Sequence, residues 1–521
     1  MPRPVYLTGR TLTRREFEDV AFRGRRVVLA PAARQACAAS RAVVERMIRD
    51  GEVVYGVTTG VGSLSTARIQ PAEARRLQLN IVRSHACGVG EPLEPEVVRG
   101  VLLLRANGLA SGLSGVRPAV ALQLCEFLNR DILPVIPSRG SVGASGDLAP
   151  LAHVALALVG EGEVTHRGRR LSSAAALARA GLRPLELHAK EGLSLVNGTQ
   201  VMTALGLVAL RRASVLVDTA DVAGALSLDA LRGSPAAFDE RLQRARPHPG
   251  QLITARNLLR LNRGSSIRRS HLGCARVQDA YSLRCMPQVH GAVRDALAYL
   301  ERVLEIEMNS ATDNPLVFAA RTSFPPRPSF PRKRESTAEG EVLSGGNFHG
   351  APLAIALDLA ALALAQLGAV SERRTDRMVN PLTSDLPPFL ARSPGLESGL
   401  MLVQVAAAAI ASENKLLAHP ASVDSIPTSG NKEDFVSMGM GAALKLGPIL
   451  KNLSTILAME LMVAAEGIDR LAPLATGRLA EVARQRVRSA VRPLTHDRPL
   501  SADIARLAEL VANGHFADIL V

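Results

Sequence analysis

The sequence predicts a mainly α fold, with a large central bundle of long helices and a smaller mixed N-terminal region. Of the 521 residues, 47% are hydrophobic but only 3% are aromatic, and tryptophan is absent. The core must therefore be packed mostly from Ala, Leu and Val, a composition that favours helices over sheets. Long stretches with helical periodicity also fill the chain after about residue 200.

Residues 1–200 are expected to form the mixed N-terminal region. The chain starts with a short extended segment, and residues 52–66, rich in Gly and Thr, predict an irregular loop after a short strand. Residues 164–170 indicate a small hairpin. Helices are predicted at about 32–49, 72–84 and 96–109.

Residues 201–521 are expected to form the helical bundle. Its most apolar stretch, residues 353–370, contains Asp358 and Gln366, which would be costly at the centre of a bilayer. We therefore expect buried bundle helices and no membrane contact. Pro-rich and basic residues 321–337 interrupt the bundle and are expected to be a disordered surface insertion. The predicted long helices are 201–230, 288–309, 350–377, 398–417, 436–467 and 476–491.

Charge and cysteine content argue against several classes of function. The net charge is +14, but the arginines are scattered and no nucleic-acid-binding motif accompanies them, which argues against a nucleic-acid partner. The five cysteines are widely spaced without a CxxC pair, so neither a disulfide framework nor a zinc site is indicated. The N-terminus has no signal-peptide core, and we expect a cytoplasmic protein.

The run from residue 140 to residue 150 contains the tripeptide Ala144-Ser145-Gly146. In a tight enough bend, the amide nitrogen of Gly146 can attack the carbonyl carbon of Ala144, which closes a five-membered ring with loss of water. Loss of the Ser145 hydroxyl then gives a 4-methylidene-imidazol-5-one (MIO), a carbon electrophile. Glycine allows the close approach because it has no Cβ. A simpler interpretation, a loop before a helix with Asp147 as its N-cap, is compatible, since that helix start would face Ser145.

Two polar segments carry further candidates. Tyr55 lies in the Gly- and Thr-rich loop, away from apolar surroundings. Gln278, Tyr281 and Arg284 are three residues apart, and on a helix they would span about 120° of one face. A guanidinium fork on such a face suits a carboxylate.

Taken together, these segments resemble the MIO-dependent ammonia-lyases, a family that includes histidine, phenylalanine and tyrosine ammonia-lyases and related aminomutases. The resemblance covers nearly the whole chain apart from residues 321–337, and the histidine branch is closest. It implies that Ala144, Ser145 and Gly146 form the MIO cofactor, on a loop of the N-terminal region, and that Tyr55 is the catalytic base.

The resemblance also implies roles for residues elsewhere in the chain. Asn197 would contact the cofactor and the substrate carboxylate, and Tyr281 would also be catalytic. Arg284, with Gln278, would hold the carboxylate. The remaining implied residues are Phe348 as an aromatic wall, Glu413 as an acid near the substrate side chain, and His85, of the Ser84-His85 pair, as the selector for histidine.

The implied partners are a small amino acid substrate and other copies of the chain, in a homotetramer with shared active sites. No metal and no nucleotide are expected, since the spacings of His153, His349 and His419 match no metal motif. The implied reaction converts L-histidine to urocanate and ammonia.

Several positions depart from the histidine pattern, and alternatives stay open. These positions are Thr58, Ala280, Met286 and residues 350–352. A tyrosine or phenylalanine ammonia-lyase giving a cinnamate-type acid is one alternative, and an aminomutase that returns the amine to the β-carbon is another. From a different class, the chain could be a catalytically silent relative or a basic scaffold for an acidic partner.

Overall fold

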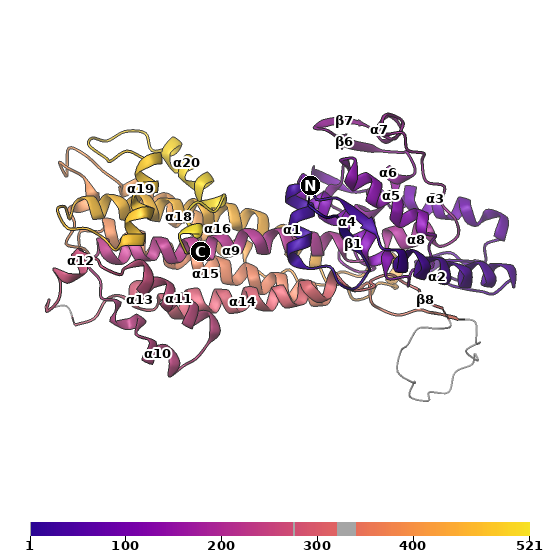
Figure 1. Ribbon diagram of the computed structural model, residues 1–521, viewed down its shortest axis with the longest axis horizontal. Coiled ribbons are helices and arrows are strands. Elements are labelled where there is room, and N and C mark those ends of the chain that lie inside the picture. The colour runs from indigo at the N-terminus through magenta and orange to yellow at the C-terminus, as the bar shows by residue number, and fades with distance from the viewer. Residues whose placement is uncertain (1, 275–276, 320–339, 521) are drawn as a thin grey trace. The chain divides into compact units, whose positions relative to one another are not determined.

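The computed structural model describes residues 2–274, 277–319 and 340–520 (Figure 1). The insertion expected at residues 321–337 lies outside these ranges. The described chain forms two compact units, and the boundaries after residues 208, 301 and 355 fall within the long helices α9 (Gln200–Ala230), α14 (Met286–Glu307) and α15 (Ala351–Val379). The first unit contains residues 1–208, 302–355 and 420–444, and the second contains residues 209–301, 356–419 and 445–521. The division expected near residue 200 lies close to the first of these boundaries, but the first unit also includes two later segments.

All strands among the described residues belong to the first unit, in four small sheets. β1 (Val5–Leu7) pairs in parallel with β2 (Val27–Leu29), whereas β3 (Val89–Pro92) with β5 (Pro137–Arg139) and β8 (Leu316–Phe318) with β9 (Glu341–Leu343) are antiparallel. The third sheet consists of β4 (Ile132–Pro134), β6 (Glu163–His166) and β7 (Arg169–Ser172). β6 and β7 confirm the expected hairpin, beside α7 (Ser173–Ala180; Figure 1).

Helices pack around these sheets in the first unit. α4 is almost entirely buried, with Val101, Leu102 and Leu103 fully inaccessible, and it packs on α1 and α5. A loop is found at 52–66 as expected, but its preceding strand does not form, because the Val54 amide donates to the Thr58 hydroxyl (2.8 Å). The helices are α1 (Arg14–Arg23), α2 (Pro31–Arg49), α3 (Ala74–His85), α4 (Pro95–Ala110), α5 (Pro118–Asn129), α6 (Leu148–Leu158) and α8 (Glu191–Val196).

Long helices dominate the second unit, and they confirm the mainly α fold class. α18 is buried along most of its length and packs on α16 and α20. The predicted helix 436–467 is split before α18, because Pro448 has no N–H to donate to the preceding turn. The long helices are α9 (Gln200–Ala230), α14 (Met286–Glu307), α15 (Ala351–Val379), α16 (Met401–Leu417) and α18 (Leu446–Asp469). The shorter ones are α10 (Glu240–Arg244), α11 (Pro249–Leu261), α12 (Ser266–Arg269), α13 (Tyr281–Arg284), α19 (Arg478–Ala490) and α20 (Ser501–Ala512), whereas α17 (Gly439–Leu444) belongs to the first unit.

Three long helical stretches of the described chain are apolar enough, by length and composition, to cross a membrane. They are Gln200–Ala230, Ala351–Val379 and Gly439–Asp469, and 72%, 61% and 78% of their most apolar windows are buried inside the protein. Asp358, within the second stretch, forms an ion pair with Lys445. Burial of this kind is typical of bundle helices, and the absence of membrane contact stays a prediction.

Candidate active site

The tripeptide lies in a tight bend between β5 and α6. Ser145 has φ of 50° and Gly146 has φ of 74°, both in the left-handed region. This conformation costs a non-glycine residue about 1 kcal/mol or more, so the surroundings must hold Ser145 in place. A bend of this kind brings neighbouring peptide groups together, and these three residues therefore suit ring closure.

The turn between α8 and α9 holds the bend. Gly146 and Gly198 form a parallel bridge, and a Cβ on Gly146 would lie 2.0 Å from the carbonyl oxygen of Gly198. Only glycine fits at position 146 for this reason. The Asp147 amide donates to the same oxygen (2.7 Å), and Asn197 Nδ2 donates to the Ser145 carbonyl oxygen (3.0 Å). Asn197 therefore contacts the tripeptide, and its predicted contact with a cofactor and a substrate stays a prediction.

Asp147 has a different role from the N-cap that its position suggests. It precedes α6, but its side chain makes no capping bond to that helix. Its Oδ2 instead accepts from the amides of Val201 (2.7 Å) and Met202 (3.1 Å), in the first turn of α9. Burial raises the pKa of Asp147 to about 7, although both amide bonds oppose the shift. The carboxyl group therefore fastens the bend to the start of α9.

Arg105 supports the same turn from behind. Its guanidinium is buried and donates to the Asn197 carbonyl (2.8 Å), to Gln200 Oε1 (2.7 Å) and to the Ser194 carbonyl. Burial lowers the pKa of Arg105 to about 10, and the negative charges of Asp313 and Asp147 oppose this shift. A charged donor here fixes the backbone that carries Asn197.

Glu433 is the carboxylate that contacts the tripeptide. Ser145 Oγ donates to Glu433 Oε1 (2.8 Å), and Thr428 Oγ1 donates to Oε2 (2.5 Å). Burial lowers the pKa of His85, and the nearby Glu433 charge partly opposes that shift. Glu433, which the sequence did not indicate, therefore contacts the serine of the tripeptide, and its charge reaches the predicted selector His85.

Tyr55 belongs to the same group of loops. Its phenol oxygen accepts from the Gly62 amide (3.0 Å). A Cβ on Gly62 would lie 2.9 Å from Ser429 Oγ, so the Tyr55 loop packs closely against the loop that leads to Glu433. The hydroxyl proton of Tyr55 remains available to a further partner.

Phe348 is half-buried in the segment that leads into α15. The next residue, His349, stacks on Phe435 with ring centroids 6.3 Å apart and forms a hydrogen bond to its carbonyl oxygen. The Gly350 amide donates to the Gly143 carbonyl (3.0 Å). The expected aromatic wall therefore belongs to a segment that contacts the loop carrying the tripeptide.

The other predicted site residues belong to the second unit. α13 comprises only Tyr281–Arg284, so Gln278 precedes it, and the three residues do not share one helical face as the spacing suggested. Tyr281 is 73% exposed, and Arg284 Cζ lies 4.8 Å from its ring centroid, a cation–π contact. Glu413 is exposed on α16.

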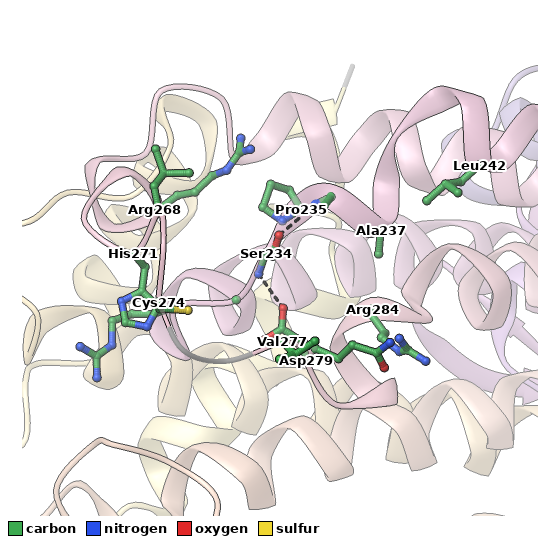
Figure 2. A pocket seen from close by; sticks show the side chains of 15 residues that line it. Ser234, Pro235, Ala237, Leu242, Arg268, His271, Cys274, Val277, Asp279 and Arg284 are labelled. Atoms are coloured by element: carbon green, nitrogen blue, oxygen red, sulfur yellow. Dashed lines mark hydrogen bonds between the residues drawn. The ribbon is translucent and has the colours of Figure 1, made fainter.

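A cavity of about 370 Å³ adjoins the α13 segment (Figure 2). Gln278, Arg284 and Arg268 are among the residues that line it. Figure 2 shows Asp279 inside this lining, where it accepts from the Ser234 amide (2.6 Å). An anionic group can therefore meet cationic and amide donors beside α13.

No group of three or more His, Cys, Asp or Glu side chains among the described residues could hold a metal ion. What the site offers is a strained serine-containing bend, a carboxylate and a histidine beside it, and a tyrosine on an adjoining loop. This combination suits the generation of an electrophile and proton transfer next to it.

Comparisons with known proteins agree with this description. The family profile for aromatic amino acid lyases matches residues 12–489. The chain is 55% identical to a histidine ammonia-lyase of Koribacter versatilis over 514 residues, 98% of either chain. Among solved structures it is similar to histidine ammonia-lyase from Trypanosoma cruzi (38% identity, TM-score 0.88, 99% of this chain and 95% of that one) and to tyrosine aminomutase from Streptomyces globisporus (37%, 0.89, 99% and 98%).

Proposed function

Because the chain belongs to the aromatic amino acid lyase family and is a carbon–nitrogen lyase, we propose that it eliminates ammonia from L-histidine to give urocanate. Two findings support histidine as the substrate: the 55% identity to a histidine ammonia-lyase and the Ser84-His85 pair beside Glu433. The observation that carries the reaction class is the left-handed bend at Ser145, with its hydroxyl on Glu433.

In this proposal Ala144, Ser145 and Gly146 become the MIO group, which would supply an electrophilic carbon to the substrate amine. The residues present fit that group, because the turn with Gly198 leaves no room for a side chain at position 146. Asn197 holds the carbonyl of Ser145 and fixes the orientation of the bend. Asp147 and Arg105 keep that turn rigid from behind.

Tyr55 is proposed to take the β-proton of the substrate. Its phenol oxygen already accepts an amide hydrogen from Gly62, and such a donor stabilises negative charge on the oxygen when the proton leaves. Phe348 would form one wall of the space beside the bend.

Glu433, rather than Glu413, is proposed as the acid that meets the substrate side chain. Glu433 accepts a hydrogen bond from Ser145 Oγ and its charge reaches His85, and no described contact of this kind links Glu413 to the bend within one copy of the chain. A carboxylate and a histidine together can bind both nitrogens of an imidazole.

Arg284 is proposed to bind the substrate carboxylate, with Gln278 and Tyr281 beside it. These residues belong to the second unit and the bend to the first, and we propose that active sites are shared between copies in a homotetramer. Exposed apolar side chains on α15 and α16 suit contacts between copies. They include Leu359, Leu362, Leu402 and Val405. A cytoplasmic location goes with this proposal.

Incubation of the purified protein with L-histidine, L-tyrosine and L-phenylalanine separately tests the substrate. We expect a conjugated acrylate and free ammonia from L-histidine. Turnover of tyrosine or phenylalanine in its place, in line with the departures at Thr58 and Gly350, would overturn the substrate choice. A β-amino acid product would identify an aminomutase.

Mass spectrometry of the peptide containing residues 144–146 tests the cofactor independently. We expect this peptide to be lighter than its sequence by two water molecules. A peptide of full mass in active protein would contradict the MIO proposal, and a peptide of full mass in inactive protein would favour the silent relative.

A further inference from the structure

We propose that Arg374, which lies in the core of the second unit, is a positioning residue that holds the Tyr281–Arg284 turn in the geometry needed to bind the substrate carboxylate. The proposal rests on the function proposed above, because it takes Arg284 as the carboxylate ligand. Its physical basis is a chain of buried hydrogen bonds that reaches this turn from four helices.

Arg374, on α15, has a fully buried side chain that donates in three directions. Nε and Nη2 form a bidentate pair with Glu460 of α18 (2.5 and 2.9 Å). Nη1 donates to His290 Nε2 (3.2 Å) and to the Ser282 carbonyl oxygen (3.4 Å). The last contact links the core to the middle of the α13 turn.

The hydrogen-bond pattern fixes the protonation of His290. Arginine can only donate, so His290 Nε2 must be the acceptor. The proton is therefore on Nδ1, which donates to Asp221 Oδ1 (2.8 Å). Burial lowers the pKa of His290 and keeps the ring neutral. A neutral ring in this tautomer orients the Arg374 Nη1 group.

Asp221 and Glu460, the residues at the two ends of this hydrogen-bond network, have further hydrogen-bond partners. Asp221 Oδ2, on α9, accepts from Arg294 Nη2 (2.6 Å) and Asn257 Nδ2 (2.8 Å). Glu460 accepts from the hydroxyls of Ser227 (2.7 Å) and Ser371 (2.5 Å). Because its partners are themselves held, Arg374 has little freedom to move.

A glycine makes room for this arrangement. A Cβ on Gly224, of α9, would lie 3.7 Å from Arg374 Cζ and 2.4 Å from Met286 Sδ. Met286 is the first residue of α14 and follows the α13 turn directly along the chain. The guanidinium and the end of the turn are therefore packed against one spot on α9.

A role of Arg374 in stability alone does not account for its contact with Ser282. Replacing a buried ion pair by well-packed apolar residues is often neutral for stability, but apolar side chains could not donate to Ser282. The turn gains from such a donor, since the carbonyl groups at the end of a helix have no intrahelical partner and Tyr281 is 73% exposed. A four-residue helix without support frays, and a frayed turn misplaces Arg284.

The test compares Arg374→Lys with Ser371→Ala. The lysine keeps the positive charge facing Glu460 but loses the fork, and with it the bond to Ser282. The alanine removes one hydrogen bond to Glu460 and leaves the Ser282 contact in place. We expect Arg374→Lys to raise KM for the amino acid about tenfold with kcat within about threefold, and Ser371→Ala to change neither beyond about twofold. An equal rise of KM in both variants, or no rise in either, would overturn the proposal.

Hydrogen exchange of the α13 amides gives a readout that needs no enzyme activity. The amides of Leu283, Arg284 and Cys285 donate to carbonyl oxygens of residues 280 and 281. We expect their exchange to be several times faster in Arg374→Lys and unchanged in Ser371→Ala. Unchanged exchange in Arg374→Lys would refute the positioning role even in an active enzyme. Wild-type protein that turns over no amino acid would refute the proposed function and leave the exchange result to decide the positioning role.

A second variant keeps the proposal testable if the first variant does not fold. If Arg374→Lys does not fold, the double variant Arg374→Met/Glu460→Met replaces the ion pair by apolar side chains of similar volume. It should fold and show the same faster exchange and the same rise in KM. A folded double variant with wild-type exchange and KM would overturn the proposal.

Discussion

Two regions of this protein, the bend at Ser145 and the network around Arg374, treat buried polar groups in opposite ways. Around the bend at Ser145, in the first unit, Asn197 Oδ1 and Asp147 Oδ1 are buried without a hydrogen-bond partner among the described residues, and Ser145 itself has a strained backbone. In the second unit, every side-chain nitrogen and oxygen that is buried on Arg374, Glu460 and His290 has a partner.

This difference in hydrogen bonding distinguishes a region suited to chemistry from a region that supports it. Unpartnered polar atoms and left-handed backbone cost free energy, and proteins keep them where chemistry requires them. A fully bonded network contributes rigidity, and it can define the position of a neighbouring turn. The bend at Ser145 therefore carries strain that suits the proposed reaction, and the network around Arg374 supplies a rigid support.

Ser145→Ala should have the largest effect, because it removes the reactive residue of the bend and leaves the network around Arg374 unchanged. Alanine cannot lose a hydroxyl, so no electrophile can form, and we expect kcat to fall by at least about four orders of magnitude. The fold should survive, since a methyl group replaces a hydroxymethyl group at a half-buried position. Product absorbance measures the loss, and a thermal melt within a few degrees of the wild type is the control. Retention of a tenth of the activity would contradict the assignment.

Glu433→Gln tests whether the acid beside the bend is functional. The amide keeps the shape and loses the charge that faces Ser145 and His85, and we expect kcat/KM to fall about a thousandfold. Glu413→Gln is the comparison variant, and it should stay within about twofold of the wild type if Glu433 is the acid that meets the substrate. A large loss in Glu413→Gln with none in Glu433→Gln would reverse the two assignments.

The raised pKa of Asp147 should make the free energy of unfolding depend on pH. Its pKa is raised from 3.8 to about 7, so the native state binds a proton that the unfolded state has already lost between these values. This contribution is present at low pH and declines as pH rises through 7, by about 2 kcal/mol between pH 5 and pH 7. Urea unfolding across that range should therefore show a decline in the wild type that is absent in Asp147→Asn. Parallel profiles in the two proteins would refute the raised pKa.

Gly224→Ala should have the smallest effect, in the second unit. The added methyl group would meet the flexible end of Met286, which can shift. We expect a loss of about 1 kcal/mol in unfolding free energy, because overpacking outweighs the gain in helix propensity. Urea unfolding measures this value. A stabilised variant would show that the contact at Gly224 is looser than the structure indicates.

Local sequence patterns predicted the fold class and most of the bend. Small residues around Ser145 indicated a tight turn, and Asn197 is where the family resemblance expects the contact to be. Asp147 was expected to cap the helix that follows it, yet it caps α9, because side-chain partners depend on which segments pack together.

The acid beside the bend shows the same limit. Glu413 lies within α16 and Glu433 in the polar segment that follows it, and the hydrogen bond of Glu433 to Ser145 appears only in the folded chain, so the sequence did not indicate it. The predicted helix at 436–467 missed its break because periodicity outweighed the single Pro448. The three-residue spacing from Gln278 to Arg284 suggested a helix longer than the four residues of α13.

The distance along the chain between Ser145 and Glu433 has a consequence for biosynthesis. The two residues are 288 positions apart, and the bend also requires Gly198 and the first turn of α9. A nascent chain on the ribosome lacks the acid until nearly all of it has been translated. If ring closure needs the bend as Gly198, α9 and Glu433 hold it, the proposed electrophile is made only after synthesis of the first unit is complete, and unfinished polypeptides carry no reactive carbon that could alkylate cellular thiols and amines.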